Sequence, residues 1–537
     1  MECRALPFRQ LPHQSKLFIQ FLDNFSSVKQ FYGQPPNLQA AKKVARSLEY
    51  PPERRAKVAG ILAEQNAAFG AGDASRENIN RLAKGAVAVV SGQQVGLFSG
   101  PAYAIYKAVS AIQIAQELTE AGVDAVPVFW MATEDHDLEE VRTSTWFHEG
   151  KLKRFELPGN GDAGLPVGRI ALGSRVAEMV HEAAQMLTAA GGEFAAGIFR
   201  ESYGAQETYG SSFGKLFARL FAGQGLILLD PLDSRLHRVG GEVLRRAVEE
   251  RDELNESLLA RGKELDKAGF DAQVKVTARS TLIFGLEKGR RQPVSVSGGK
   301  FVCGERTWTK EELTQAVQKQ PEQFSPNALL RPVLQDFLLP TAAYIAGPAE
   351  IAYYAQAEVI YKKLLGRMPV ILPRAAFTIL DAKAEKLLRR YGLKVEDVWS
   401  GSQELRRKME TSSVPATLGK NFEKTVKESA RMLAQLKKQI VRLDPTLAGA
   451  VETAQKKIAF QLEKLKHKTG KAQALRGGLI AAHQEFLESL LYPHKMLQSR
   501  ELCFLPFLAA WGPGGLKELQ SLAASSKWNE HRIVRIP

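Results

Sequence analysis

The sequence predicts an α/β protein in which a parallel sheet is followed by a long α-helical arm. Two observations predict the sheet: apolar runs of strand length alternate with helical stretches, and polar residues follow several of those runs directly. A third observation predicts the arm. Beyond about residue 383 the apolar residues take a heptad spacing, which is typical of paired helices.

Length and composition set the outer limits. The chain has 537 residues, more than one hydrophobic core usually serves, so we expect several structural units. These are a helical segment at 1–82, a core at 83–382, an antiparallel coiled-coil arm at 383–491 and a segment at 492–537 that returns to the core. Hydrophobic residues make up 45% and charged residues 24%, which is ordinary globular composition and excludes a disordered or membrane-embedded chain.

The cysteines and the amino terminus indicate a cytoplasmic protein. Cys3, Cys303 and Cys503 lie far apart and form no CxxC pair, as expected of a reduced compartment. The first residues lack a basic segment followed by an apolar one, and no apolar run is long enough to span a bilayer. We therefore expect no membrane partner.

Individual strands can be placed from their apolar runs. Strands are predicted at 86–91, 125–131, 225–229, 342–346 and 370–372, and a helix at 103–121. Glycine-rich, β-prone stretches at 146–172 and 281–308 interrupt this alternation. They are interpreted as insertions near 145–200 and 268–325.

The arm shows a regular apolar seam. Its members are spaced alternately four and three residues apart: Phe422, Val426, Ser429, Leu433, Leu436, Ile440 and Leu443. Pro445 ends this helix because proline lacks an N–H and clashes with the preceding turn. A second helix from 447 to 491 would reach about 65 Å. Its shorter partner cannot cover that length, so we expect the chain to form a homodimer through the coiled coil.

Charge is concentrated in the same arm. The formal net charge is +15, and residues 401–480 alone carry 17 basic and 7 acidic side chains. A basic surface of this kind is suited to nucleic acid or another polyanion, including nucleotide phosphates. It is equally the solvated face of a coiled coil, and the sequence leaves both interpretations open.

The first strand leads into a glycine-rich loop. Gly92, Gly96 and Gly100 lie between that strand and the next helix, where backbone amides and the helix amino end favour a phosphate or carboxylate. The spacing matches neither the dinucleotide-binding nor the P-loop pattern, and tight strand-to-helix packing explains the glycines as well. Gln93 and Gln94 favour binding, because amides at a strand end need partners.

The second strand ends in a run of ionisable residues. Glu134, Asp135, His136 and Asp137 follow it directly, at the edge where open α/β sheets bind ligands. Three uses fit: Mg²⁺ held through carboxylates, recognition of an ammonium group, and proton transfer through His136. The alternative is an acidic helix amino terminus with a surface histidine.

Later strand ends add further candidates. Asp230 follows the strand at 225–229, although Asp-Pro is also a common turn. The segment after 342–346 repeats the first motif, and the candidates around it are Tyr344, Gly347, Glu350 and Tyr354, with Tyr103 from the first helix. Arg374 follows the last strand and suits a carboxylate or phosphate, whereas Arg331 and Asp336 are interpreted as a pair with each other.

Several kinds of chemistry are excluded. No cysteine lies beside a histidine, no Gly-x-Ser-x-Gly elbow is present, and no HExxH zinc motif occurs. The residues predict ligand activation by carboxylates and amides, and Mg²⁺ is compatible with that chemistry.

Three segments together resemble a known family: Ser91-Gly-Gln-Gln-Val-Gly-Leu-Phe-Ser-Gly-Pro-Ala-Tyr-Ala-Ile-Tyr-Lys107, Val128-Phe-Trp-Met-Ala-Thr-Glu-Asp-His-Asp137 and Ala346-Gly-Pro-Ala-Glu-Ile-Ala-Tyr-Tyr354. They are similar to the cysteine-adding enzymes of bacillithiol biosynthesis, and the resemblance spans essentially the whole chain. It implies a ligase that joins the cysteine carboxyl to the amine of glucosaminyl-malate. It also implies a Rossmann-like core with two connecting-peptide insertions, a dimerising coiled-coil arm and a cytoplasmic bacterial setting.

The resemblance leaves the mechanism open. Activation of a carboxylate points to ATP, with either ADP or AMP as product, and Mg²⁺ is compatible with both. We expect the loop from Gly92 to Gly100 to hold an anionic group and the acidic run to hold the amine, with His136 or Asp137 removing its proton. Two other classes remain: a nucleic-acid-binding coiled-coil protein and a nucleotidyltransferase-like enzyme acting on another amino acid. The acidic run argues against nucleic acid in the cleft itself.

Overall fold

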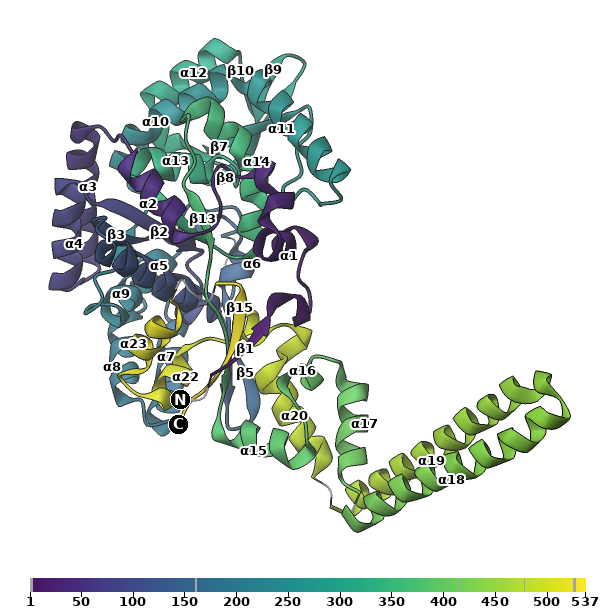
Figure 1. Ribbon diagram of the computed structural model, residues 1–537. Helices are drawn as coiled ribbons and strands as arrows, with labels where there is room; N and C mark the ends of the chain where they lie inside the picture. The colour runs from purple at the N-terminus through teal and green to yellow at the C-terminus, as the bar shows by residue number, and fades with distance from the viewer. Residues whose placement is uncertain (1–2, 160–161, 415, 478, 525–527) are drawn as a thin grey trace. The chain divides into compact units, whose positions relative to one another are not determined.

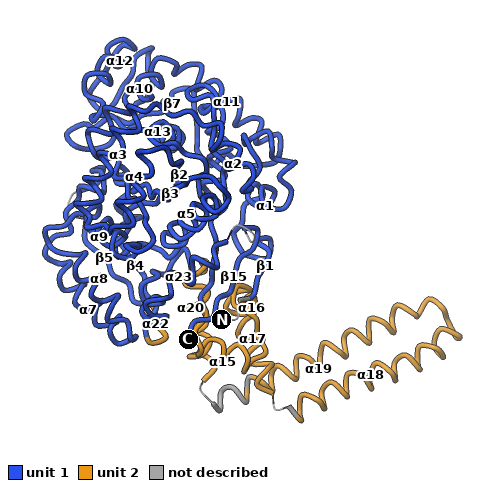
Figure 2. The backbone as a smooth tube through the Cα atoms, turned by 60° about the vertical axis from the view of Figure 1, so that its left-hand side comes forward, with its two compact units in different colours: residues 1–148, 153–379, 499–537 blue, residues 149–152, 380–498 orange. Residues whose placement is uncertain are grey.

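The computed structural model describes residues 3–159, 162–414, 416–477, 479–524 and 528–537. The chain forms two compact units, coloured separately in Figure 2. Unit 1 comprises Met1–His148, Lys153–Ile379 and Ser499–Pro537, and unit 2 comprises Glu149–Leu152 and Leu380–Gln498.

Unit 1 is built on a parallel five-stranded sheet with the order β13-β12-β2-β3-β6. Its strands are β2 (Val87–Gln93), β3 (Ala125–Met131), β6 (Ile227–Leu229), β12 (Thr341–Ala346) and β13 (Val370–Pro373). Apolar runs of this kind are needed because helices cover both faces of a parallel sheet. Every strand predicted from the sequence is present, with ends shifted by two residues or fewer, and the α/β class is confirmed.

The strand order creates a switch point beside β2. From β2 the chain continues to β3 and then β6 on one side, and it later adds β12 and β13 on the other side. Ligands of open α/β sheets bind at the carboxyl ends of the strands where the order reverses. The carboxyl ends of β2 and β12 are therefore the expected place for a site.

Helices pack on the sheet and form its core. Helix α5 (Tyr103–Glu120) packs on β2, β3 and β12, while α3 (Pro52–Ala68), α4 (Asp73–Lys84) and α9 (Tyr209–Leu220) pack near β6. Aliphatic side chains of the sheet, α5 and α2 (Leu38–Arg46) form a continuous cluster that includes Val89, Ile114, Leu118, Ile345 and Leu372. This apolar layer fixes the strands whose ends carry the polar groups.

The two ends of the chain meet in a separate sheet. Strand β1 (Cys3–Pro7) pairs antiparallel with β15 (Glu530–Arg535), and β15 also pairs with β14 (Ala376–Leu380). The amino-terminal segment is otherwise helical, with α1 (Lys16–Asp23) before α2. Figure 1 shows the two termini side by side.

Two groups of elements interrupt the parallel sheet. The first contains α6 (Leu138–Val141), β4 (Thr143–His148), β5 (Lys151–Glu156), α7 (Arg175–Ala189) and α8 (Glu193–Ser202). The second contains α10 (Ser234–Glu249), α11 (Arg251–Lys267), β7 (Ser280–Glu287), β8 (Arg290–Ser297), β9 (Lys300–Cys303), β10 (Arg306–Trp308), α12 (Lys310–Lys319) and β11 (Phe324–Pro326). Strands β7 to β11 form an antiparallel sheet of order β10-β9-β8-β7-β11. Helices α13 (Arg331–Leu338) and α14 (Pro348–Leu364) then flank β12 in sequence.

Unit 2 is helical. It contains α15 (Ala382–Tyr391), α16 (Val395–Val398), α17 (Ser402–Ser412), α18 (Ala416–Leu443), α19 (Ala448–Gly477) and α20 (Ile480–Leu491). Helices α18 and α19 lie side by side as a hairpin that turns at Pro445 (Figure 1). The prediction of one second helix from 447 to 491 is wrong, because α19 ends at Gly477 and α20 begins at Ile480. The sequence Gly477-Gly478 explains the end of α19, since glycine is a poor helix former.

The carboxyl-terminal segment of unit 1 contains α22 (Leu505–Trp511) and α23 (Gly515–Leu522), after α21 (Gln498–Glu501). Helix α22 contacts α7 and α8, and α23 contacts α5. Among the helices of the described residues, none is both long enough and apolar enough to cross a membrane.

Candidate active site

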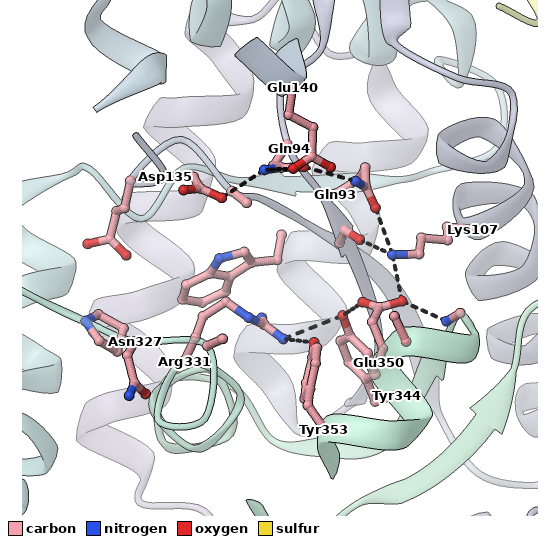
Figure 3. Close-up of a pocket in the computed structure, with 18 of the residues that line it drawn as sticks. Gln93, Gln94, Lys107, Asp135, Glu140, Asn327, Arg331, Tyr344, Glu350 and Tyr353 are labelled. Atoms are coloured by element: carbon pink, nitrogen blue, oxygen red, sulfur yellow. Dashed lines mark hydrogen bonds and ion pairs between the residues drawn. The ribbon is translucent and has the colours of Figure 1, made fainter. Parts of the chain in front are cut away.

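A cavity of about 430 Å³ lies at the carboxyl ends of the central strands (Figure 3). Its size falls within the range of small-molecule sites, roughly 300–1,000 Å³. Residues at the carboxyl ends of four neighbouring strands line it: Gly92, Gln93 and Gln94 at β2, Glu134 and Asp135 after β3, Gly347 and Glu350 after β12, and Arg374 after β13. The switch point predicted by the topology is therefore hollow and polar.

Lys107 of α5 connects several groups that line the base of this cavity. Its ammonium donates to Gly92 O at 2.7 Å and Gln93 Oε1 at 2.9 Å, and it pairs with Glu350 Oε2 at 2.6 Å. An ammonium group has three N–H donors, and these contacts use all of them. Burial lowers the pKa of Lys107, although the charge of Glu350 opposes that effect. Lys107 therefore ties β2 to α14 and gives the cavity positive potential without a spare donor for a ligand.

Glu350 stands at the centre of a network on the same side. It accepts hydrogen bonds from the Gly347 N–H at 2.6 Å and from the Tyr344 hydroxyl at 2.6 Å, in addition to its pair with Lys107. Arg331 donates to the Tyr353 hydroxyl at 3.1 Å and contacts the Tyr344 hydroxyl at 3.5 Å (Figure 3). Glu350 is consequently held by the protein and positions its neighbours.

The predicted pair between Arg331 and Asp336 is wrong. Arg331 donates to Gln335 Oε1 at 2.9 Å and lies over the rings of Trp130 and Tyr344. Asp336 is buried and takes its hydrogen bonds from Gln335 and Tyr361. Both residues belong to α13, but Arg331 faces the cavity whereas Asp336 faces the interior.

Acidic groups form the opposite wall. The amide Nε2 of Gln94 donates to Asp135 Oδ2 and to Glu140 Oε2, both at 2.8 Å (Figure 3). Burial acts to raise the pKa of Asp135, but hydrogen bonds from His136 and Gln94 and the charge of Arg291 outweigh it and hold that pKa at about 2. Partial burial raises the pKa of Glu140. Two carboxylates bridged by one amide are suited to an ammonium group.

Arg291 reaches this wall from strand β8 of the second insertion. It donates to His136 Nδ1 at 3.1 Å, and its guanidinium lies 3.9 Å from the centre of the Phe284 ring. Because arginine can only donate, Nδ1 of His136 accepts this hydrogen bond, and the same Nδ1 lies 3.5 Å from Asp135 Oδ1. Arg291 and Phe284 line the cavity, so the second insertion contributes directly to the site.

The remaining acidic candidates have internal partners. Glu134 lies 3.2 Å from Nε2 of the buried His237, although it also lines the cavity. Asp230 is half-buried, accepts hydrogen bonds from the Thr133 hydroxyl and the Leu232 N–H, and fixes the turn after β6. Burial raises the pKa of Asp230. Asp230 is thus placed as a turn residue beside the site.

Arg374 makes few side-chain contacts for a buried guanidinium that lines the cavity. It is only 8% exposed, yet among the described residues one hydrogen bond is found for its side chain, which donates to Ala375 O at 3.0 Å. Burial and the neighbouring charge of Arg500 lower its pKa to about 10. A guanidinium has five N–H donors, so Arg374 has donors to offer a carboxylate or phosphate.

The glycines act through close packing. A Cβ on Gly92 would lie 2.7 Å from Trp130 O, so glycine is required where β2 passes β3. Gly96 and Gly100 approach each other in the turn around η4 (Leu97–Ser99), where Gly100 has a φ of 66°. Of the loop predicted to hold an anion, Gly92, Gln93 and Gln94 line the cavity, whereas Gly96 and Gly100 do not.

Ten of the predicted site residues line the cavity: Gly92, Gln93, Gln94, Tyr103, Glu134, Asp135, Tyr344, Gly347, Glu350 and Arg374. Six do not: Gly96, Gly100, His136, Asp137, Asp230 and Tyr354. Asp137 caps α6 by accepting from the Glu140 N–H at 3.2 Å, and Tyr354 is buried with its ring against Tyr344.

The sequence alone did not identify several residues that line the cavity: Lys107, Trp130, Glu140, Arg291, Arg331, Tyr353 and Arg500. Of these, Lys107 had a usable signal, since it lies one helical turn after Tyr103.

The described part of the chain contains no cluster of side chains that would bind a metal ion by itself. No group of three or more His, Cys, Asp or Glu side chains there is arranged to hold a metal ion. Mg²⁺ commonly binds through one or two carboxylates together with substrate phosphates, and the lining carboxylates suffice for that arrangement.

Comparisons with known proteins cover the whole chain. The family model described as "Bacillithiol biosynthesis BshC, N-terminal Rossmann-like domain" matches residues 1–375, and "Bacillithiol biosynthesis BshC, C-terminal coiled-coil domain" matches residues 377–536. These matches agree with the sheet and the helical hairpin described above.

Curated relatives share the full length of the chain. A protein of Koribacter versatilis named "Putative cysteine ligase BshC" is 40% identical over 533 residues, which is 99% of this chain and 99% of the relative. Proteins of the same name from Solibacter usitatus and Salinibacter ruber are 38% and 30% identical, over 95% and 97% of this chain and 96% of each relative.

Proposed function

The chain belongs to the BshC family of bacillithiol biosynthesis and is a ligase, and we propose that it joins the carboxyl group of cysteine to the amine of glucosaminyl-malate. The observation that carries this proposal is the charge distribution of the cavity. Asp135 and Glu140 form an acidic wall, and Arg331 and Arg374 line the same cavity. A reaction between an amine and an acid needs both kinds of surface in one enclosed space.

The acidic wall would hold the amine. Asp135 is ionised near neutral pH because its pKa is about 2, and Gln94 fixes the direction of its carboxylate. An ammonium group that donates to Asp135 would form a charge-assisted hydrogen bond, with Glu140 next to it. His136 and Asp137 support this wall from behind, the first through Arg291 and the second by capping α6.

The basic side would hold the anionic groups. Arg374 offers unused donors, Lys107 adds positive potential, and Arg331 is stacked over Trp130 and Tyr344. Carboxylates and phosphates suit this surface equally. We propose that ATP supplies the activation of the cysteine carboxylate, either as an acyl phosphate with ADP or as an acyl adenylate with AMP, and that Mg²⁺ accompanies the nucleotide.

The helical hairpin would form a homodimer. Several large apolar side chains of α18 and α19 are exposed, including Met432 at 66%, Leu436 at 48% and Phe460 at 64%. Large apolar residues exposed on a helical hairpin are commonly covered by a second helix pair. We place this dimer in the cytoplasm, as the cysteine distribution suggests.

The test is product formation by the full-length protein. Purified protein is incubated with glucosaminyl-malate and cysteine, with and without ATP and Mg²⁺, and thiol product and nucleotide are measured together by mass spectrometry. We expect an amide product only with ATP, in equal amount to the ADP or AMP formed. An amide formed equally well without nucleotide, or no amide under any condition, would overturn the proposal.

A further inference from the structure

The two carboxylates of the acidic wall share one amide but differ in their remaining contacts. Gln94 uses both hydrogens of Nε2, one for Asp135 Oδ2 and one for Glu140 Oε2. Asp135 Oδ1 accepts a further hydrogen bond from the His136 N–H at 2.7 Å and lies 3.9 Å from Arg291. For Oε1 of Glu140, no partner is found within the described part of the chain. Glu140 thus keeps one oxygen free at the rim of the cavity.

The electrostatic surroundings of Glu140 and Asp135 also differ. The charged and titratable groups that face Glu140 are Asp135, Asp137, Tyr103 and Arg500. Partial burial raises the pKa of Glu140, and the charges of Asp135 and Asp137 add to that effect, while Gln94 and Arg500 oppose it. The pKa of Asp135 is instead held at about 2. Neighbouring carboxyls whose pKa values are pushed apart commonly divide the work of acid–base catalysis.

The other carboxylates that line the cavity are already engaged. Glu134 contacts His237, and Glu350 is held by Lys107, Tyr344 and the Gly347 N–H. Glu140 combines an oxygen for which no partner is found among the described residues with a raised pKa.

The two residues that the sequence favoured as bases are also engaged elsewhere. His136 accepts from Arg291 through Nδ1, so the nitrogen that could take a proton is occupied. Asp137 caps α6 and does not line the cavity.

We propose that Glu140 is the general base of the ligase reaction and that Asp135 holds the substrate ammonium group beside it. This inference rests on the proposed function. One proton passes from the ammonium nitrogen to Glu140, and the freed lone pair attacks the activated carbonyl carbon of cysteine. The C–N bond forms, the C–O bond to phosphate or AMP breaks, and the second amine proton leaves with that group.

The test compares Glu140→Gln with a matched control, Glu139→Gln, in the full-length protein. Glu139 is the adjacent residue of α6, is 76% exposed and pairs with Arg142 at the surface. Each variant is assayed for kcat and for the KM of glucosaminyl-malate between about pH 6 and pH 9, and binding of glucosaminyl-malate is measured by calorimetry.

For Glu140→Gln we expect kcat near neutral pH to fall by about 100-fold, which is typical of a lost general base, while binding changes by less than about threefold. Its log kcat should rise with pH until the free amine predominates in solution, at roughly pH 8. Glu139→Gln should match the wild type. Glu140→Asp, which keeps the carboxylate on a shorter chain, should retain an intermediate kcat.

Several results would overturn the inference. These are a kcat of Glu140→Gln within threefold of the wild type, a loss confined to KM, or the same pH-dependent loss in Asp135→Asn while Glu140→Gln stays active. If the wild type forms no amide, the proposed function itself fails and this inference falls with it, so the two failures are distinguishable.

Discussion

Replacing Lys107 by methionine tests whether the floor of the cavity depends on a buried ion pair. The side chains of Lys107 and Glu350 are 5% and 14% exposed, and their charged atoms lie 2.6 Å apart. Removing one partner of such a pair leaves the other charge buried and costs about 3–5 kcal/mol. Methionine also removes the hydrogen bonds to Gly92 O and Gln93 Oε1. We therefore expect Lys107→Met to lower the free energy of unfolding by about 4 kcal/mol.

Glu350→Gln should cost less, about 1.5–3 kcal/mol, because the amide oxygen still accepts one hydrogen bond. The double variant should be more stable than the sum of the two losses predicts, by about 1–3 kcal/mol, since neither charge is then left alone. Urea denaturation followed by tryptophan fluorescence measures all three, with Lys57→Met as the control at an exposed lysine of α3. A loss below about 1 kcal/mol for Lys107→Met, or strictly additive losses, would refute the reasoning.

Four further predictions follow from other residues. Arg374→Met should raise the KM of an anionic substrate at least about tenfold, because a charged hydrogen bond contributes about 1.5–3 kcal/mol. Steady-state kinetics measure this KM, and an unchanged KM for every substrate would contradict the prediction. Gly92→Ala should lower the free energy of unfolding by about 1–3 kcal/mol, since its Cβ would lie 2.7 Å from Trp130 O, whereas Gly60→Ala, which meets nothing within 4 Å, should not destabilise. Asp135 stabilises the folded protein above its ordinary pKa of 3.8, and this stability is lost as the pH falls toward the folded-state pKa of about 2. The difference in unfolding free energy between wild type and Asp135→Asn should therefore narrow by about 1–2 kcal/mol between pH 5 and pH 2. A constant difference would contradict the low pKa. Met432→Glu combined with Phe460→Glu should convert the proposed homodimer to a monomer in light scattering, because both side chains are more than half exposed on the hairpin. A mass unchanged from that of the wild type would contradict a dimer interface at these residues.

Much of the fold could be predicted because it follows from local pattern. The strands of the parallel sheet are buried on both faces, so each is a short apolar run that stands out from its neighbours. The heptad spacing and Pro445 likewise located the helical hairpin. The end of α19 at Gly477 was missed because a sustained apolar pattern outweighed the glycine pair in the prediction.

The site could be predicted only where residues follow strands directly. Gln94, Asp135 and Arg374 reach the cavity because the carboxyl ends of parallel strands share one edge. Residues next to them in the sequence do not all line the cavity, because the chain turns after Asp135 and places Asp137 at the amino-terminal cap of α6. Arg291 comes from the second insertion, and its approach to His136 depends on tertiary packing that no local pattern encodes.

Activation of the cysteine carboxylate is the central claim, and oxygen-18 transfer tests it most directly. Cysteine labelled with oxygen-18 in both carboxyl oxygens is incubated with the full-length protein, glucosaminyl-malate, ATP and Mg²⁺, and the products are separated by mass spectrometry. We predict that the amide keeps one labelled oxygen and that the other appears in phosphate or AMP, in equal amount to the amide. Amide formed without label in either phosphate or AMP would contradict activation by ATP.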